Sequence, residues 1–239
     1  PDERVSTGIP HLDGMLGGEG VYRGSSVLVS GTAGSGKSSI AAHVAAACCA
    51  RGERCLYFAF EESQAQILRN MRSIGIDLAP FVESGLLVFH TARPSLFGLE
   101  MHLAVMHQRV EELDPTIVIV DPVTNLFAAG TEVDVHAMLV RFIDFKKSRG
   151  ITAFFTSLTS GAESLQETAL GISSLMDTWL LLRFIEGNGE RNRGLQVLKS
   201  RGTAHSNQIR EVVMTEQGIR LLDAYTGSSG VLTGTARVV

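Results

Sequence analysis

The segment 31–38, Gly-Thr-Ala-Gly-Ser-Gly-Lys-Ser, matches the pattern GxxxxGK[ST] and has the chemistry of a phosphate-binding loop. Its glycines let backbone N–H groups turn inward around a β-phosphate. Lys37 would reach the β- and γ-phosphates, and the Ser38 hydroxyl would hold Mg²⁺. An apolar strand precedes the loop, and a helix follows it with its positive end toward the same phosphates. We therefore expect an ATP site here rather than an ordinary glycine turn.

Carboxylates follow two other apolar strands. Asp121 ends one, where a side chain faces the ligand crevice of a parallel sheet, and it would hold Mg²⁺ through a water molecule. Glu61 and Glu62 end the other, and adjacent carboxylates are unfavourable unless a cation lies near. We expect Glu61 to orient and deprotonate the attacking water or hydroxyl, with Glu62 in support. The alternatives are a turn-capping role for Asp121 and, for the glutamates, a favourable position at the start of the next helix.

A pair of cations ends a later strand. Lys199 and Arg201 lie two residues apart just before Gly202, and alternate residues of a strand share a face. Two cations on one face suit a clamp on a triphosphate, and arginine fingers often come from a neighbouring subunit. The alternative is a solvated strand face.

The elements that position these residues alternate along the chain. Strands are expected at 26–30, 55–60, 86–90, 116–120 and 151–157, and helices at 38–51, 63–73, 98–113 and 133–148. This alternation predicts an α/β fold of the RecA-like P-loop type, a parallel central sheet flanked by helices. Shorter strands at 180–185, 195–201, 209–214 and 219–222 predict an antiparallel β extension of the same sheet. We expect one domain over 1–225 and a loose tail over 226–239.

Composition narrows the class of protein. The 239 residues are 44% apolar and 19% charged, with a net charge of −4, so neither a basic balance nor a basic stripe favours nucleic acid as a partner. The three cysteines are interpreted as reduced small hydrophobes, which indicates a cytoplasmic protein. The sequence has no apolar run of membrane-spanning length and no signal peptide, so we expect no membrane partner. A start at Pro1 suggests an excised domain of a longer protein.

Taken together, the motifs resemble the KaiC family of circadian-clock ATPases, and more closely the second of that family's two repeats. The resemblance covers about residues 4–222. Its matching segments are 4–13 (RVSTGIPHLD), the phosphate loop, 58–63 (FAFEES), 68–70 (LRN), 172–177 (ISSLMD) and 199–202 (KSRG). Many ATPases share the loop, whereas the paired glutamates together with the Lys-x-Arg-Gly strand are much more specific.

The resemblance implies a hexameric ring with ATP bound between subunits. One subunit would bind ATP through Gly31, Thr32, Ala33, Gly34, Ser35, Gly36, Lys37, Ser38 and Ser39. The neighbouring subunit would contact the same nucleotide through Arg193, Lys199, Ser200, Arg201, Gly202, Thr203, His205 and Asn207. Glu61 matches the family's catalytic glutamate, which is also associated with Mg²⁺. The expected metal-associated residues are therefore Ser38, Glu61 and Asp121.

The resemblance also implies a phosphorylation site. In the family's second repeat an adjacent Ser-Thr pair is phosphorylated by ATP of the adjoining subunit, and the matching pair here is Ser173-Ser174. A polar helix turn is the alternative interpretation. Three departures point to a bacterial relative rather than the cyanobacterial clock protein. Ala169 replaces an aspartate beside the phosphorylation sites, Ile74 replaces a tryptophan near the adenine base, and Asn207 replaces a lysine that contacts nucleotide. Clock or signalling proteins are the implied partners.

Three functions remain open on the sequence. The leading one is a hexameric ATPase with serine autokinase activity. A DNA-dependent RecA-like motor would need basic or aromatic loops facing the ring's centre, and the expected central stretch, 156–167, carries acids and no Lys or Arg. A non-hydrolysing nucleotide switch that acts as a scaffold would function without the base at Glu61.

Overall fold

The computed structural model describes residues 2–159, 171–187 and 190–222. The expected tail at 226–239, Ala169 and the part 160–167 of the expected central stretch lie outside these ranges.

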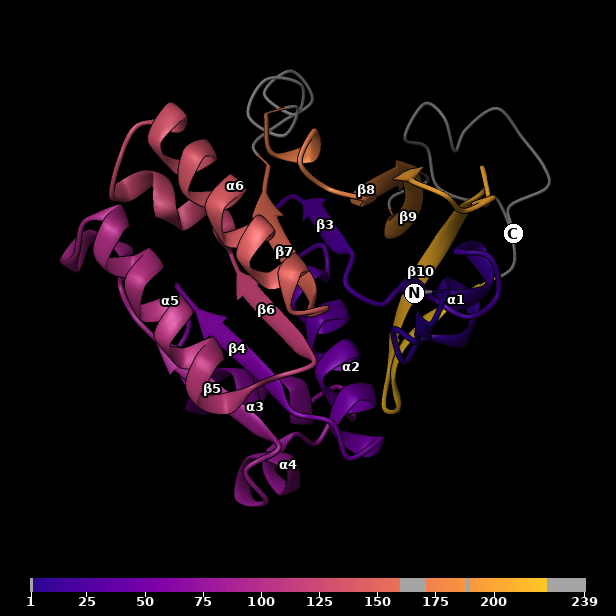
Figure 1. Ribbon diagram of the computed structural model, residues 1–239. Coiled ribbons are helices and arrows are strands. Elements are labelled where there is room, and N and C mark those ends of the chain that lie inside the picture. Colours follow the sequence, from indigo (N-terminus) through magenta and orange to yellow (C-terminus); the bar gives the residue numbers. More distant parts are fainter. Residues whose placement is uncertain (1, 160–170, 188–189, 223–239) are drawn as a thin grey trace.

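A large mixed sheet forms the centre of the molecule (Figure 1). Within the described residues its nine strands are, in spatial order, β5 (Leu87–Thr91), β4 (Cys55–Ala59), β6 (Ile117–Asp121), β7 (Thr152–Leu158), β3 (Ser26–Gly31), β8 (Thr178–Gly187), β9 (Glu190–Ser200), β10 (Ile209–Thr215) and β11 (Gly218–Leu221). The strands from β5 to β8 pair in parallel, and those from β8 to β11 pair antiparallel. The predicted parallel sheet with an antiparallel extension is confirmed.

Helices cover both faces of the parallel part, as the alternating pattern predicted. Helices α5 (Leu99–Leu113) and α6 (Glu132–Ser148) pack on one face (Figure 1). On the other face lie α2 (Lys37–Ala50) and α3 (Gln64–Arg72). The strands between them are buried on both sides, which explains their uninterrupted apolar sequences.

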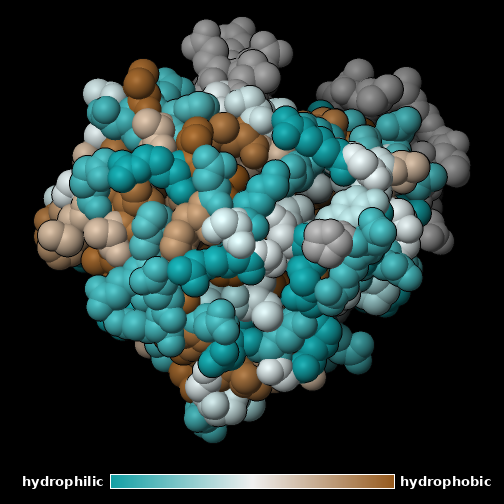
Figure 2. All heavy atoms as spheres, in the orientation of Figure 1, coloured by the Kyte–Doolittle hydropathy of each residue, from teal (hydrophilic) through white to brown (hydrophobic). Residues whose placement is uncertain are grey.

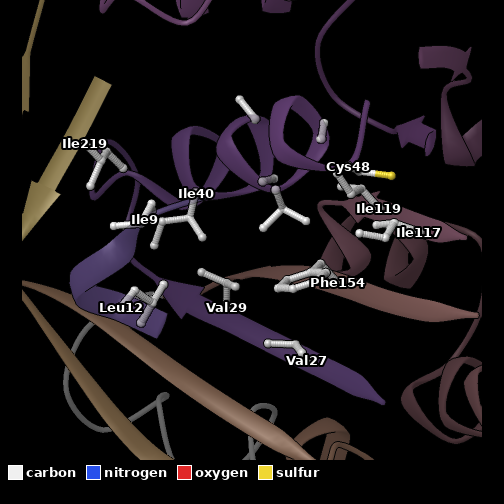
Figure 3. Close-up of a cluster of buried hydrophobic side chains, with 14 of the residues drawn as sticks. Ile9, Leu12, Val27, Val29, Ile40, Cys48, Ile117, Ile119, Phe154 and Ile219 are labelled. Atoms are coloured by element: carbon white, nitrogen blue, oxygen red, sulfur yellow. The ribbon is translucent and has the colours of Figure 1, made fainter. Parts of the chain in front are cut away.

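The core beneath α2 fixes the helix that starts at the phosphate loop. Ile40 of α2 lies against Val29 of β3 and Ile9 of the N-terminal segment, with Phe154 of β7 beside them (Figure 3). All four side chains are at most 2% exposed. Burying side chains of this size contributes about 1.5–3 kcal/mol each, so the start of α2 is held firmly relative to the end of β3.

Two helices begin with reciprocal capping interactions. At the start of α3, the Ser63 side chain accepts from Gln66 N and the Gln66 side chain accepts from Ser63 N. Thr131 and Asp134 make the same pair of bonds at the start of α6. Such caps satisfy backbone donors that the first turn leaves free. The cap at Ser63 therefore fixes one end of the short connection between β4 and α3, which contains Glu61 and Glu62.

The sequence pattern missed the shortest elements. They are β1 (Arg4–Val5), α1 (Pro10–Met15), β2 (Val21–Tyr22), α4 (Ala79–Glu83), η1 (Pro94–Leu96) and η2 (Val123–Ala128). Each is shorter than the stretch of residues over which a hydrophobic periodicity can be recognised. The expected bounds of β8 and the expected start of β9 were also too narrow, because these strands include polar residues beyond the apolar ones.

The surface and the thiols agree with the composition. Hydrophilic residues cover most of the face in Figure 2, and apolar patches lie over the upper ends of α5 and α6. Leu96, Phe97, Met101 and Val133, at or near the starts of these helices, are more than half exposed. The three cysteines are free and buried, as expected. In the described part of the chain, every helix is too short or too polar to cross a bilayer.

Candidate functional site

A pocket of about 450 Å³ lies where β3, β4 and β6 end. Its lining includes many of the residues singled out from the sequence: Ala33, Gly34, Gly36, Lys37, Ser38, Ser39, Glu61, Glu62, Asp121 and Arg193. The remaining lining residues are Ile67, Asn70, Met71, Ile74, Pro122, Leu158 and Met214. The pocket thus combines a phosphate loop, carboxylates and an apolar wall.

The phosphate loop has the backbone that its glycines allow. Gly34 and Gly36 have φ angles of +73° and +108°, which L side chains rarely adopt. A Cβ at Gly31 would lie 2.7 Å from the carbonyl oxygen of Leu182, so the strand end also requires glycine. Helix α2 begins at Lys37, and its unpaired N–H groups therefore lie at the loop. This arrangement suits an anion.

Lys37 folds back over its own loop. Its Nζ donates to Thr32 O at 2.8 Å, and the residue is 9% exposed. Burial lowers the pKa of Lys37, and the charges of Asp121 and Glu61 act in the opposite direction. A phosphate would supply the anion that this buried ammonium lacks in the loop.

Asp121 collects several hydroxyl donors. The Ser38 hydroxyl donates to Asp121 Oδ2 at 2.8 Å, and the Tyr57 hydroxyl donates to the same oxygen. The Thr156 hydroxyl donates to Oδ1. Burial, and then the charge of Asp121, raises the pKa of Tyr57 well above its usual range, so its hydroxyl stays protonated. A serine hydroxyl bonded to a carboxylate at a phosphate loop is a set of hard oxygen ligands that fits Mg²⁺.

The two glutamates have different surroundings. Glu61 is exposed and lines the pocket, whereas Glu62 is half-buried and accepts from Asn70 Nδ2 at 3.2 Å. Burial raises the pKa of Glu62, followed by the negative charges of Asp121 and Glu61. Glu61 is therefore the more accessible carboxylate, and Glu62 is tied to α3.

The apolar wall was only partly foreseen. Ile67 and Met71 from α3, Ile74 just after that helix, and Met214 from β10 line one side of the pocket. Of these four residues, the sequence singles out only Ile74, as the replacement for a tryptophan of the family. Met214 approaches the loop so closely that a Cβ at Gly36 would lie 2.8 Å from its Cε atom. Flexible methionines next to a phosphate loop offer an adaptable surface for a planar base.

Arg193 lies at the phosphate loop of its own chain. Its Nε donates to Gly34 O at 3.1 Å, and its guanidinium lies 5.5 Å from the centre of the Phe184 ring. The resemblance implied that Arg193 would contact the nucleotide of a neighbouring subunit. The contact seen here depends on the pairing of β8 with β9, in which Arg193 lies opposite Phe184.

Lys199 and Arg201 bind a different segment, which we call the serine turn (171–177). Lys199 Nζ donates to Ser173 O at 3.0 Å, and Arg201 Nη2 donates to Ser174 O at 3.1 Å. Asp177 Oδ1 lies 3.9 Å from Arg201 Nη1. Burial lowers the pKa of Lys199, as does the charge of Arg201. Neither cation is among the described residues that line the pocket.

The two serines differ in exposure. Ser173 is 5% exposed, whereas Ser174 is exposed and its hydroxyl donates to Gly171 O at 2.9 Å. The structure therefore brings the predicted phosphorylation pair together with two of the cations expected to contact a neighbour's nucleotide.

The rest of the predicted neighbour-contacting segment packs on the N-terminal region. The Ser200 hydroxyl pairs with Thr178 Oγ1 at 3.1 Å. Gly202 O accepts from the Tyr22 hydroxyl at 3.0 Å, and Thr203 Oγ1 accepts from Arg4 Nη1 at 3.1 Å. The His205 ring lies 3.2 Å from Ser206 O, and Asn207 is exposed. These contacts hold the segment away from the pocket of its own chain.

Comparisons with known proteins agree with this geometry. A family model described as "ATPase: KaiC" matches residues 5–225. The chain is 52% identical over 238 residues to the circadian clock protein KaiC2 of Synechocystis sp., covering 99% of the chain and 42% of that protein. It is 37% identical over 235 residues to the circadian clock oscillator protein KaiC of Thermosynechococcus vestitus, covering 97% of the chain and 45% of that protein. The chain therefore spans less than half the length of these relatives.

Proposed function

Because this chain belongs to the KaiC family and is one ATPase domain of it, we propose that it works as a protomer of a hexameric ring. In this proposal ATP and Mg²⁺ bind between subunits, and the γ-phosphoryl group passes either to water or to a serine hydroxyl of the adjoining subunit, with ADP as the leaving group in both cases. The observation that carries the proposal is the pocket, in which the phosphate loop, the Ser38–Asp121 pair and Glu61 converge.

Each residue of the pocket has a chemical task in this proposal. The loop amides and Lys37 bind the phosphates, and Ser38 with Asp121 would hold Mg²⁺. The metal ion, when bound, offsets negative charge on the phosphate oxygens. Glu61, exposed at the pocket, orients a water or serine hydroxyl and takes its proton. The apolar wall would exclude water from the adenine ring of the nucleotide.

A second protomer would complete the site. Phosphoryl transfer spreads negative charge over the transferred oxygens, and additional cations stabilise that charge. Lys199 and Arg201 bind main-chain oxygens of the serine turn and do not belong to the described lining of their own pocket. We therefore assign them, with the segment 200–207, to the nucleotide of a neighbour. The same contact would bring Ser174 toward that neighbour's γ-phosphate.

The test compares the purified chain with and without ATP and Mg²⁺. Native mass spectrometry measures the oligomer, phosphate release measures turnover, and peptide mapping locates phosphate. We expect six-subunit rings with ATP, slow turnover, and phosphate on Ser174 in preference to buried Ser173. Lys37→Ala should lose both activities. A chain that stays monomeric with ATP would contradict the ring.

The same experiment separates the other candidate functions. Unchanged function in Glu61→Gln would favour the non-hydrolysing switch, because an enzyme should lose turnover. Turnover that rises with single-stranded DNA at low salt would favour the DNA motor, since phosphate contacts are strongest there. Turnover without phosphate on Ser173 or Ser174 would leave an ATPase that is not an autokinase.

A further inference from the structure

A buried tyrosine hydroxyl lies against the carboxylate that the proposed function assigns to Mg²⁺. Tyr57 is in the middle of β4 with no exposed surface, and its hydroxyl donates to Asp121 Oδ2. Among the described residues, two more hydroxyls donate to this carboxylate: Ser38 to Oδ2 and Thr156 to Oδ1. The mechanism above uses Ser38 but gives Tyr57 no task.

The pleat of the sheet explains this meeting. Tyr57 and Ala59 face the core beneath α2, because alternate residues of a strand share a face. In the parallel register of β4 and β6, Tyr57 lies beside Ile119 and Ala59 beside Asp121. The Tyr57 side chain therefore starts two positions before the level of Asp121 and reaches along the sheet to the end of β6. It reaches the carboxylate on the face from which α2 brings Ser38.

Packing alone does not call for this hydroxyl. The Tyr57 ring packs on Phe89 with ring centres 4.9 Å apart, a contact that a phenylalanine would make equally well. A hydroxyl removed from water is unfavourable unless it finds a hydrogen-bond partner. Here the partner is the carboxylate of the metal site, so the hydroxyl acts on the orientation of Asp121.

The number of donors limits what Asp121 can still bind. An ionised carboxylate offers about four lone-pair positions. The hydroxyls of Ser38, Tyr57 and Thr156 take three of them. About one position is left, which suits a single hydrogen bond from a metal-bound water. Groups that orient a metal's binding residues in this way typically change metal affinity or activity by 10–100-fold.

We propose that Tyr57 is a positioning residue of the Mg²⁺ site, whose hydroxyl holds Asp121 ready for both the Ser38 hydroxyl and a water of the metal ion. The proposal rests on the proposed function, because it presumes that Mg²⁺ enters with the nucleotide. Without the hydroxyl, Asp121 Oδ2 keeps one of its two donors and the carboxylate becomes free to turn. Nucleotide binding should then need more Mg²⁺, while metal-free binding to the loop is retained.

The test titrates Mg²⁺ against binding of a fluorescent ATP analogue, for the wild-type chain and Tyr57→Phe. We expect the Mg²⁺ concentration at half-maximal effect to rise about tenfold in the variant. Binding in EDTA and the melting temperature should stay close to wild type. Thr116→Val is a matched control, because it removes another hydroxyl that donates to a carboxylate, Glu53 Oε2 at 3.2 Å, at the opposite end of β6. This control should leave the titration unchanged.

A second pair of variants tests the same carboxylate from its other oxygen. Thr156→Val removes the donor to Asp121 Oδ1 and should shift the Mg²⁺ titration in the same direction, and Thr156→Ser should restore it. A wild-type titration curve in Tyr57→Phe would overturn the proposal. So would an equal loss of binding with and without Mg²⁺, which would indicate a role in folding the loop. A wild-type chain whose nucleotide binding ignores Mg²⁺ would instead contradict the proposed function itself.

Discussion

The phosphate-loop region and the serine turn differ in the carboxylate around which the loop region gathers its hydroxyl groups. Around the loop, the Ser38 and Tyr57 hydroxyls donate to the Asp121 carboxylate, and Lys37 donates to a carbonyl of the loop itself. At the serine turn, Lys199 and Arg201 donate to main-chain carbonyls. Carbonyls orient a cation without neutralising it, and the Asp177 carboxylate, 3.9 Å from Arg201, offsets only part of the charge of the two cations. In the proposed function the first region therefore binds phosphate and metal, and the second supplies positive charge.

The sheet keeps the two regions apart within one chain. The loop follows Gly31 at the end of β3, and Gly31 pairs with Leu182 of β8. Lys199 lies opposite Trp179, which pairs with Leu28, earlier on β3. The cations therefore start several strand positions before the loop and two strands away from it. This separation means that single-chain experiments probe the first region, whereas the second is best probed in the ring that we propose.

The largest effect is expected on turnover when Arg201 of the serine-turn region is replaced. Arg201→Ala should lower turnover in the ring roughly 1000-fold, as for other arginines that stabilise phosphoryl transfer from a neighbour. Glu61→Gln should also be nearly inactive. Rings mixed from the two variants should recover part of the turnover, because some interfaces then combine an intact Glu61 with an intact Arg201. Phosphate release from mixed and unmixed rings is the measurement, and no recovery on mixing would mean that Arg201 acts within its own chain.

The adjacent glutamates offer an internal control for the loop region. Glu61→Gln should lower kcat about 100-fold or more with little change in ATP affinity, since it removes a base. Glu62→Gln should lower kcat less than tenfold, because Glu62 is half-buried and already bonded to Asn70. Steady-state phosphate release and binding of labelled ATP measure the two quantities. Equal losses in the two variants would contradict the assignment of the base to Glu61.

Arg193 tests whether a residue of β9 acts on the nucleotide of its own chain. Because its Nε donates to Gly34 O of its own chain, Arg193→Gln should weaken nucleotide binding up to about tenfold. The weakening should be the same in dissociated protomers and in rings. Mixing with Glu61→Gln protomers should not restore affinity. Affinity that falls only after assembly would return Arg193 to the group of residues that contact a neighbour.

Much of the loop region was predictable because local patterns define it. The segment 31–38 contains its own signature, and apolar runs bounded by turns predicted the strand that ends at Asp121 and the strand that ends at Ala59, two residues before Glu61. Tyr57 and Thr156 were not found. In strands buried on both faces, period-2 alternation does not tell which face a residue occupies, so a tyrosine in such a run is indistinguishable from core packing.

The second region was harder to predict because it depends on pairings distant in sequence. The chain places Arg193 on its own loop only through the β8–β9 register, and that register shifts between Trp179 and Leu180. The grip of Lys199 on the serine turn joins residues 26 positions apart. The serine pair itself came from family resemblance, since two adjacent serines carry no physical signal of their own.

The smallest effect on activity is expected at a buried lysine near the serine turn, which instead affects stability. Lys146 is fully buried, its Nζ donates to Gly24 O at 2.7 Å, and burial lowers its pKa to about 7 while Asp177 acts in the opposite direction. The folded chain thus releases this proton before the unfolded chain does, so the free energy of unfolding should rise between about pH 7 and pH 10.

Lys146→Met should flatten that rise, because methionine does not titrate. The rise in the free energy of unfolding between pH 7 and pH 10 should be smaller in the variant by about 4 kcal/mol, at about 1.4 kcal/mol for each pH unit, and each kcal/mol corresponds to roughly 2–4 °C in melting temperature. The slope is the useful quantity, since the variant also loses the bond to Gly24 O and shifts the whole curve. Lys147→Met, the exposed neighbour, is the control and should keep the wild-type slope. Parallel curves of unfolding free energy against pH for wild type and Lys146→Met would show that water reaches the Lys146 ammonium. The region beneath the serine turn would then be more hydrated than its packing indicates.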